Sequence, residues 1–339
     1  MRRIVILGST GSIGRQALDV VGRSGGELGA VALAAGSGWE PLVRQAVEHG
    51  VTRIALADPD AAARAAEVWT DGEVLAGPDG LVSLITEGEC DLVLNAVAGA
   101  AGLGPTVAAL GEGIDLALAN QESLVIGGEL VMALAEATST TIVPVNSSHS
   151  ALQQLLAGER PGTVDRLVLT AAGGDLMSKG FEVIEAMHLF GLPLEAIDVL
   201  VHPESVVHAL IQLNDGTSLA HLGPPDMRVP ISYALNHPER ADVPVEPLDL
   251  AELGRLTFER PDLDEYPCLR LALQAAKAGG TAPCVLHAAY EVALAERVAS
   301  VAEVVERTLQ RVEVREVRHF SDLYRADEAA REAAAGVLA

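Results

Sequence analysis

The segment Ile4-Val5-Ile6-Leu7-Gly8-Ser9-Thr10-Gly11-Ser12-Ile13-Gly14 decides the fold of this chain. Four apolar residues predict a short buried strand, and three glycines follow at G-x-x-G-x-x-G spacing before a helical pattern begins. Glycines let the backbone turn tightly against a pyrophosphate, and the start of a helix offers N–H groups and a partial positive charge. The segment therefore predicts a dinucleotide-binding turn. Its expected binding residues are Gly8, Thr10, Gly11, Ser12, Ile13 and Gly14.

Residues 1–145 alternate short apolar runs with helical patterns. The runs are Ile4–Leu7, Ala30–Ala34, Arg53–Ala57, Asp91–Ala96, Ile114–Ala119 and Thr141–Val145. Continuous apolar runs of this length between helices are typical of a parallel sheet covered on both faces. We therefore expect an α/β chain whose N-terminal domain, residues 1–145, is a Rossmann-like, doubly wound parallel sheet.

The rest of the chain predicts a domain with a mixed sheet and helices over 146–238, a connector over 239–267 and a helical domain over 268–339. The central elements that we expect are a helix from about Ser150, a strand Arg166–Thr170, a helix Met177–Phe190, a strand Ile197–Val201 and a hairpin of Val206–Gln212 and Ser218–Leu222. The connector is rich in Pro, Asp and Glu, whereas the C-terminal segments are Ala-rich with apolar residues at helical spacing.

Composition narrows the classes of partner. With 49% hydrophobic residues the chain is neither disordered nor fibrous, and a formal net charge of −24 excludes nucleic acid and anionic membrane as natural partners. The 3 cysteines are far apart and form neither a disulfide framework nor a zinc pattern. The apolar run after Met1 is too short for a signal peptide, and no run is long enough to span a membrane. We expect a cytoplasmic protein that acts on a small molecule.

The end of the second apolar run bears on the choice of cofactor. It reads Ala34-Ala35-Gly36-Ser37-Gly38, with no acidic residue to hold the ribose 2′-OH of NAD and no Arg or Lys for a 2′-phosphate. Gly36 and Ser37 would line the cofactor here, and Ser37 could donate one hydrogen bond. These residues favour NADP and leave NAD open.

Ordered blocks along the chain resemble the 1-deoxy-D-xylulose 5-phosphate reductoisomerase family. They are Gly8–Gly14, Asn95–Pro105, Ala117–Val125, Pro144–Ala151, His202–His208, Gly223–Pro230 and Tyr266–Leu269, so the resemblance covers nearly the whole chain. It implies NADPH, a divalent metal, and the rearrangement of a phosphorylated ketose to an aldehyde that is then reduced by hydride transfer. It also implies that residues 146–238 form a catalytic and dimerisation domain, so that the protein would be a homodimer. It also implies cofactor contacts for Asn120 and Glu122.

The residues at the chemistry depart from the family pattern. Asn146 and Ser148 stand where the family has two of its three metal-ligand carboxylates, and the third is kept as Glu182. Divalent cations such as Mg²⁺ need that negative charge, so we expect no tightly bound divalent metal. Gln121 replaces a family Lys, Ala172 a phosphate-binding Ser, and about three dozen residues that would form the family's mobile lid are absent after Gly174. The expected substrate-binding residues are Gln121, Ser147, Ser148, Gly173, Gly174, Ser178 and Lys179.

From these departures the sequence predicts an NAD(P)-dependent oxidoreductase acting on a small, anionic carbonyl or alcohol without metal. Lys179 and Glu182, one helical turn apart, would be catalytic, with His149 and His202 beside them. Two alternatives stay open. The first is the family's own reductoisomerase reaction, and the second is a non-catalytic dinucleotide-binding protein.

Overall fold

The computed structural model describes residues 1–174 and 176–338, which form two compact units. The first unit comprises 1–120, 133–150 and 226–245, and the second comprises 121–132, 151–225 and 246–339. Neither unit is continuous in sequence, so the chain passes between them several times. Each unit is described by itself below, and the expected domain boundaries at 145, 238 and 267 stay predictions.

The first unit is built on a seven-stranded sheet whose neighbouring strands are all parallel, which confirms the expected fold class. Its strands, in the order in which they lie, are β4 (Glu73–Ala76), β3 (Arg53–Leu56), β2 (Leu28–Ala35), β1 (Arg2–Leu7), β5 (Leu92–Asn95), β6 (Asp115–Leu118) and β7 (Ile142–Pro144). The strand order reverses between β1 and β5. In such sheets ligands bind at the carboxyl ends of the strands beside this reversal.

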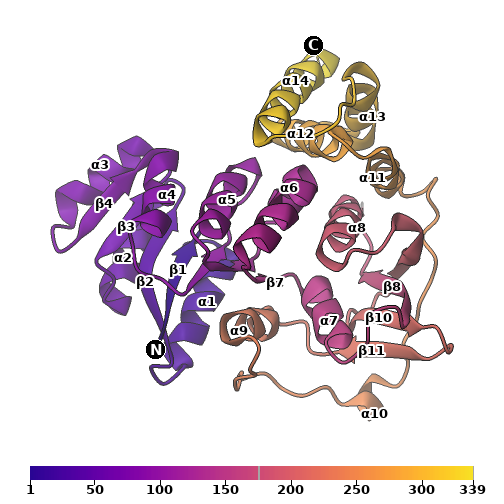
Figure 1. Cartoon of the computed structure of the whole chain (residues 1–339), viewed down its shortest axis with the longest axis horizontal. Coiled ribbons are helices and arrows are strands. Elements are labelled where there is room, and N and C mark those ends of the chain that lie inside the picture. The colour runs from indigo at the N-terminus through magenta and orange to yellow at the C-terminus, as the bar shows by residue number, and fades with distance from the viewer. Residues whose placement is uncertain (175, 339) are drawn as a thin grey trace. The chain divides into compact units, whose positions relative to one another are not determined.

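Helices cover this sheet, as Figure 1 shows for its indigo to magenta part. They are α1 (Ser12–Arg23), α2 (Trp39–His49), α3 (Pro59–Val68), α4 (Gly77–Thr86) and α5 (Leu103–Gly111), with a short 3₁₀ turn at Ala100–Gly102 and α9 (Arg228–Asn236) joining from later in the chain. Strand β1 is buried from Ile4 to Leu7 because it has a neighbour on both sides. Strand β4 was not predicted from the sequence, because it lies at the edge of the sheet, is half exposed and has only the short apolar run Val74–Ala76.

The second unit holds a four-stranded mixed sheet, as expected. Its strands lie in the order β11 (Ser218–Leu222), β10 (Val207–Leu213), β8 (Val164–Ala171) and β9 (Ile197–Val201). β10 is antiparallel to both of its neighbours, and β8 is parallel to β9. The expected hairpin is confirmed, with Gln212 paired to Ser218. Helix α8 (Met177–Phe190) has the expected bounds, whereas α7 (Ser147–Leu156) begins three residues before Ser150.

The C-terminal region is helical, as expected, and its last three helices lie together in Figure 1. It contains α11 (Pro267–Ala278), α12 (Ala282–Ala295), α13 (Val301–Arg311) and α14 (Phe320–Leu338). Before it, residues 239–266 carry only the four-residue α10 (Leu250–Leu253) and one bridge between Val201 and Glu259.

Two further helices are α6 (Glu122–Thr138), which kinks at Gly127, and a 3₁₀ turn at Leu194–Ala196. Within the described residues, no helix combines the length and apolar character needed to cross a membrane.

Candidate active site

The glycine turn leaves the carboxyl end of β1 with no room for side chains. Gly8 has φ +78°, and a Cβ there would lie 2.2 Å from the carbonyl oxygen of Ala96. A Cβ on Gly14 would lie 2.4 Å from the carbonyl oxygen of Gly8. The first turn of α1 therefore packs directly against the loop that precedes it, as a turn that must admit a pyrophosphate requires.

Hydrogen bonds fix the shape of this turn. The N–H groups of Gly8 and Ser9 both donate to the carbonyl oxygen of Ala34, each at 2.9 Å. The Ser9 hydroxyl donates to Oε1 of Gln45 at 2.8 Å, and Nε2 of Gln45 returns a hydrogen bond to the Ser9 carbonyl at 2.9 Å. Buried Ser9 therefore anchors the turn through Gln45, a contact between residues 36 positions apart that no local pattern predicts.

The residues that follow the anchor lie at the surface. Gly11 and Ser12 are exposed, and Thr10 and Ile13 are half-buried. At the end of β2, Gly36 and Ser37 are exposed as well. The side chain of Thr10 approaches this second segment, because a Cβ on Gly38 would lie 3.8 Å from its hydroxyl oxygen. The structure thus brings together the two segments expected to bind the dinucleotide.

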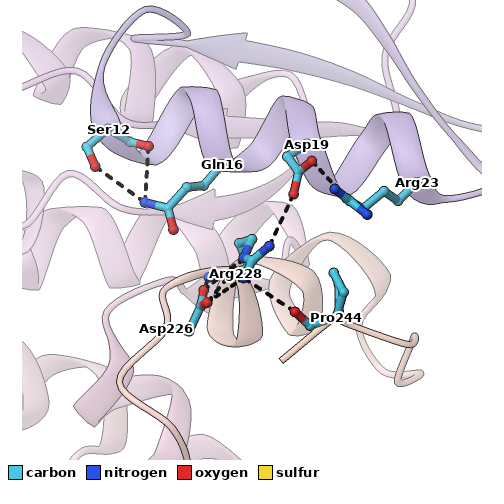
Figure 2. Close-up of polar contacts among 7 residues, drawn as sticks. All are labelled: Ser12, Gln16, Asp19, Arg23, Asp226, Arg228 and Pro244. Carbon is cyan, nitrogen blue, oxygen red and sulfur yellow. Dashed lines mark hydrogen bonds and ion pairs between the residues drawn. The ribbon is translucent and has the colours of Figure 1, made fainter. Parts of the chain in front are cut away.

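Helix α1 contacts the segment that begins at Asp226, and an ion pair joins the two (Figure 2). Nη2 of Arg228 pairs with the Asp226 carboxylate at 2.7 Å, and its Nη1 lies 3.6 Å from the carboxylate of Asp19 on α1. Arg228 also donates to the carbonyl oxygen of Pro244 at 3.4 Å. A guanidinium shared among three acceptors fixes α9 against the helix that carries the glycine turn.

Asn120 has a structural task in addition to its expected cofactor contact, which stays a prediction. Its Nδ2 donates to the carbonyl oxygens of Val97 at 2.8 Å and Gly99 at 3.0 Å. The buried amide of Asn95 supports the same loop through the carbonyl oxygen of Gly102. These two amides shape the loop after β5, which lies beside the glycine turn because Gly8 packs on Ala96.

The two catalytic candidates of α8 form a buried ion pair in the second unit. Nζ of Lys179 lies 2.5 Å from Oε2 of Glu182, and the two residues are 9% and 6% exposed. Removing both charges from water is costly and is tolerated only where they face each other. The sequence spacing therefore predicted correctly that Lys179 and Glu182 contact each other. Because both side chains are buried, they are not a solvent-exposed surface pair.

Glu185, one further turn along α8, was missed from the sequence. It is buried, and its Oε2 accepts a hydrogen bond of 2.8 Å from Nε2 of Gln121. Burial raises the pKa of Glu185 well above its usual value, and the Gln121 hydrogen bond opposes that rise. A sequence signal was available, since the ionisable residues Lys179, Glu182, Glu185 and His188 recur every three residues along this largely apolar helix.

Gln121 also contacts Ser178, another of the expected substrate-binding residues. Its Nε2 donates to the carbonyl oxygen of exposed Ser178 at 3.2 Å, so the start of α6 is linked to the start of α8. Gly173 and Gly174 are exposed, with φ of +118° and +94°, and a Cβ on either would meet open space. Backbone N–H groups in such a segment are suited to an anionic ligand.

The two candidate histidines are both buried. His202 is held firmly, with Nδ1 at 2.9 Å from the Thr257 carbonyl oxygen and Nε2 accepting from the Val207 N–H at 3.2 Å. Its ring stacks on Phe258 at 4.7 Å between centroids. These bonds place Nε2 as an acceptor and Nδ1 as the protonated nitrogen. His149 lies in the first turns of α7, where its N–H donates to Oδ1 of Asn146 at 3.3 Å.

The residues at the expected metal positions are poor ligands. Oδ1 of Asn146 caps α7 by accepting from the N–H groups of Ser148 at 2.9 Å and His149. Ser147 begins the helix, and buried Ser148 contributes a neutral hydroxyl. The one carboxylate at these positions, Glu182, is ion-paired with Lys179. Asn146 thus acts as a helix cap, and the set lacks the charge that a divalent cation needs.

Known proteins resemble this chain over most of its length. A family model described as 1-deoxy-D-xylulose 5-phosphate reductoisomerase matches residues 4–128, and one described as DXP reductoisomerase C-terminal domain matches 222–333. The reductoisomerase of that name from Symbiobacterium thermophilum is 47% identical over 330 residues, covering 86% of this chain and 85% of the relative. That from Anaeromyxobacter dehalogenans is 43% identical over 371 aligned positions, covering 97% and 95%.

Solved structures agree. The reductoisomerase from Zymomonas mobilis in complex with NADPH superposes with a TM-score of 0.92 at 35% identity, covering 99% of this chain and 98% of that one. A second structure, with NADPH, fosmidomycin and magnesium, has the same TM-score of 0.92 at 34% identity and the same coverage of 99% and 98%.

These matches overturn one prediction. The prediction of an oxidoreductase that acts on an unidentified carbonyl or alcohol is wrong, because relatives 43% and 47% identical carry the reductoisomerase name. Identity spread over the whole chain outweighs a few changed side chains around one site. The first alternative drawn from the sequence agrees with the comparisons.

Proposed function

The chain belongs to the 1-deoxy-D-xylulose 5-phosphate reductoisomerase family, and from that premise we propose that it is an NADPH-dependent reductoisomerase of 1-deoxy-D-xylulose 5-phosphate. It would rearrange this phosphorylated ketose to an aldehyde and reduce the aldehyde by hydride transfer. The observation that carries the proposal is identity of 43% to a reductoisomerase across 97% of the chain. The intact glycine turn, the first requirement for the reduction, supports it.

In this proposal the first unit supplies the hydride donor. The turn from Gly8 to Gly14 would hold the pyrophosphate of NADPH, and the N-terminal N–H groups of α1 would stabilise its charge. Gly36 and Ser37 would hold the adenosine ribose at the end of β2. The anchoring of Ser9 by Gln45 and of α1 by Arg228 keeps this cradle in shape before the cofactor arrives.

The second unit supplies the charged groups of the substrate site. Lys179 provides an ammonium for the substrate's negative oxygens or a proton for the oxygen of the aldehyde as the hydride arrives. Glu182 holds that ammonium at 2.5 Å. The backbone of Gly173 and Gly174 offers donors to the phosphate. His202, with both ring nitrogens bonded, positions the loop before β10.

We further propose that this chain is a divergent member in its metal-binding residues. A relative's structure contains magnesium, but Asn146 here is a helix cap and Ser148 is neutral. A single carboxylate, already paired with Lys179, does not fit a divalent cation. No step of the proposed reaction is therefore assigned to a metal at these three positions.

The connection between β8 and α8 is also proposed to be shortened. Only residues 172–176 separate the two elements. The alignment with the Anaeromyxobacter relative has 371 positions, which exceeds the 339 residues of this chain by 32, so at least that many positions have no counterpart here. Neither family model covers 129–221, the part that contains this connection. A short connection would leave the substrate more open to water.

The test is turnover by the full-length protein. Purified protein is mixed with 1-deoxy-D-xylulose 5-phosphate and NADPH, with Mg²⁺, Mn²⁺ or EDTA, and absorbance at 340 nm and ³¹P NMR identify the product. We expect oxidation of NADPH coupled to formation of the reduced, rearranged phosphate, and its loss in Lys179→Met. NADPH binding by fluorescence without turnover in any of the three media would overturn the proposal. The Asn146→Asp/Ser148→Glu variant should make the rate depend more steeply on Mg²⁺.

A further inference from the structure

Three side chains with metal-ligating atoms converge where α6 meets α12, and one of them, Glu122, is also a residue for which the family resemblance implies a cofactor contact. They are Glu122, the first residue of α6, and His287 and Glu291 on α12. One ligand atom from each lies within 4.8 Å of the others. His287 and Glu291 are four residues apart and so share one face of their helix, with Nε2 of the imidazole 3.8 Å from Oε1 of the carboxylate.

The imidazole in this cluster is deeply buried. His287 is 2% exposed, and its Nδ1 has no hydrogen-bond partner in the structure. The ring also contacts Phe181, at 5.5 Å between centroids, so an aromatic side chain closes one side of it. The other nitrogen, Nε2, faces the Glu291 carboxylate, so a cation bound to Nε2 and to that carboxylate would orient the ring.

The charges around the cluster favour a cation. Arg331 pairs with Oε2 of Glu291 and with Asp327, leaving Oε1 of Glu291 on the side of His287. The charges that act on His287 are thus three carboxylates, those of Glu122, Glu291 and Asp327, and one guanidinium, an excess of two negative charges. A divalent ion would balance that excess without displacing Arg331, which binds the other oxygen.

The donor set selects the class of ion. One imidazole nitrogen and two carboxylate oxygens suit Zn²⁺ or Mn²⁺ better than Mg²⁺ or Ca²⁺, which prefer oxygen alone. Bonds of about 2.1 Å to a tetrahedral ion place neighbouring ligand atoms about 3.4 Å apart. The 3.8 Å between His287 and Glu291 needs only a small side-chain adjustment to reach that value.

We propose that Glu122, His287 and Glu291 bind one divalent transition-metal ion, of the Zn²⁺ or Mn²⁺ class, that joins the start of α6 to α12. This ion would be structural and separate from the positions 146, 148 and 182. Its effect would extend to the catalytic helix, because Gln121, the residue before Glu122, bonds to Glu185 and to the Ser178 carbonyl oxygen of α8.

The experiment uses the full-length protein, stripped with chelator and titrated with ZnCl₂, MnCl₂ or CoCl₂. We expect one equivalent bound per chain by calorimetry, a higher thermal midpoint, and visible absorption bands from bound Co²⁺ that change in Glu291→Gln. His287→Asn should weaken binding at least about tenfold. His319→Asn, which changes an exposed histidine of the same region, is the matched control and should bind like the wild type.

Two outcomes would overturn the proposal. One is the absence of saturable binding of any of the three ions to the folded wild-type protein. The other is equal affinity in wild type and His287→Asn, with unchanged Co²⁺ bands in Glu291→Gln. If His287→Asn does not fold, the Co²⁺ spectrum of Glu291→Gln decides alone. The result is independent of turnover, so it stands apart from the test of the proposed reaction.

Discussion

Gly14 and Gly22 lie on the same helix, and substitution by alanine should have opposite effects at the two positions. A methyl group on Gly14 would lie 2.4 Å from the Gly8 carbonyl oxygen and 2.4 Å from Cα of Ser9, both backbone atoms, whereas one on Gly22 meets nothing within 4 Å. Overpacking costs about 1–3 kcal/mol, and contact with rigid backbone places Gly14→Ala near about 3 kcal/mol. Gly22→Ala should instead stabilise by up to about 1 kcal/mol, because alanine loses less backbone entropy in a helix.

The chain contains a convenient reporter for this difference. Its 2 tryptophans, Trp39 and Trp69, both lie in the first unit, so intrinsic fluorescence follows the unfolding of that unit in urea. NADPH binding is measured separately, by calorimetry or by the fluorescence of the nicotinamide. Since each 1.4 kcal/mol is a factor of about ten, a displaced turn should raise the Kd of Gly14→Ala at least about tenfold. Gly22→Ala should keep the wild-type Kd.

A result in which both variants unfold at the same urea concentration and bind NADPH equally would refute the steric argument for the turn. A loss of stability in Gly14→Ala with unchanged affinity would separate the two roles. In that case Gly14 would serve helix packing alone, and the pyrophosphate would have to lie elsewhere.

Three further predictions concern the second unit and the cap of α7. Lys179→Met removes the ammonium that faces the buried Glu182 carboxylate and should cost about 3 kcal/mol of unfolding free energy. The double variant Lys179→Met/Glu182→Leu should recover most of that stability but remain inactive. Equal stability of the single and the double variant would contradict the pairing. Because the pKa of Glu185 is raised in the folded state, its contribution to stability is present below its usual pKa of 4.5 and is lost as the pH rises through the folded-state pKa. In urea unfolding, the free energy of unfolding of wild type should therefore fall from pH 5 to pH 8 relative to that of Glu185→Gln. Parallel pH profiles of the two proteins would contradict the raised pKa. Asn146→Ala should lose about 1 kcal/mol of thermal stability while Asn146→Asp keeps the cap, and an equal melting temperature for the two would show that the cap contributes nothing.

Much of the fold followed from the sequence because burial and pattern coincide. β1 is buried on both faces, so its four apolar residues are continuous and easy to recognise. The same reasoning failed for β4 at the edge of the sheet, where Glu73 and Ala76 are exposed and the apolar pattern is short. Helix α8 was predicted with its observed bounds because Gly191 ends it in the left-handed conformation that glycine favours.

The site was less accessible to sequence reasoning. Local spacing is enough to pair Lys179 with Glu182, because both lie on one helix. The bond between Gln121 and Glu185 joins residues 64 positions apart, and no local pattern encodes such a contact. The expectation for Asn146 drew on a resemblance, and its observed task as a helix cap follows from its place before α7. Side-chain partners that come from other elements have to be seen in three dimensions.

The attachment of Arg228 to Asp19 has a consequence for how this protein can be made and divided. The segment 226–245 completes the first unit but is synthesised after all four strands of the second unit's sheet, the last of which ends at Leu222. A fragment that stops at residue 150 would lack α9 and leave the flank of α1 uncovered. Transfer of the first unit to another protein would therefore require two separate segments, 1–150 and 226–245. During translation, the first unit remains incomplete until α9 has been synthesised.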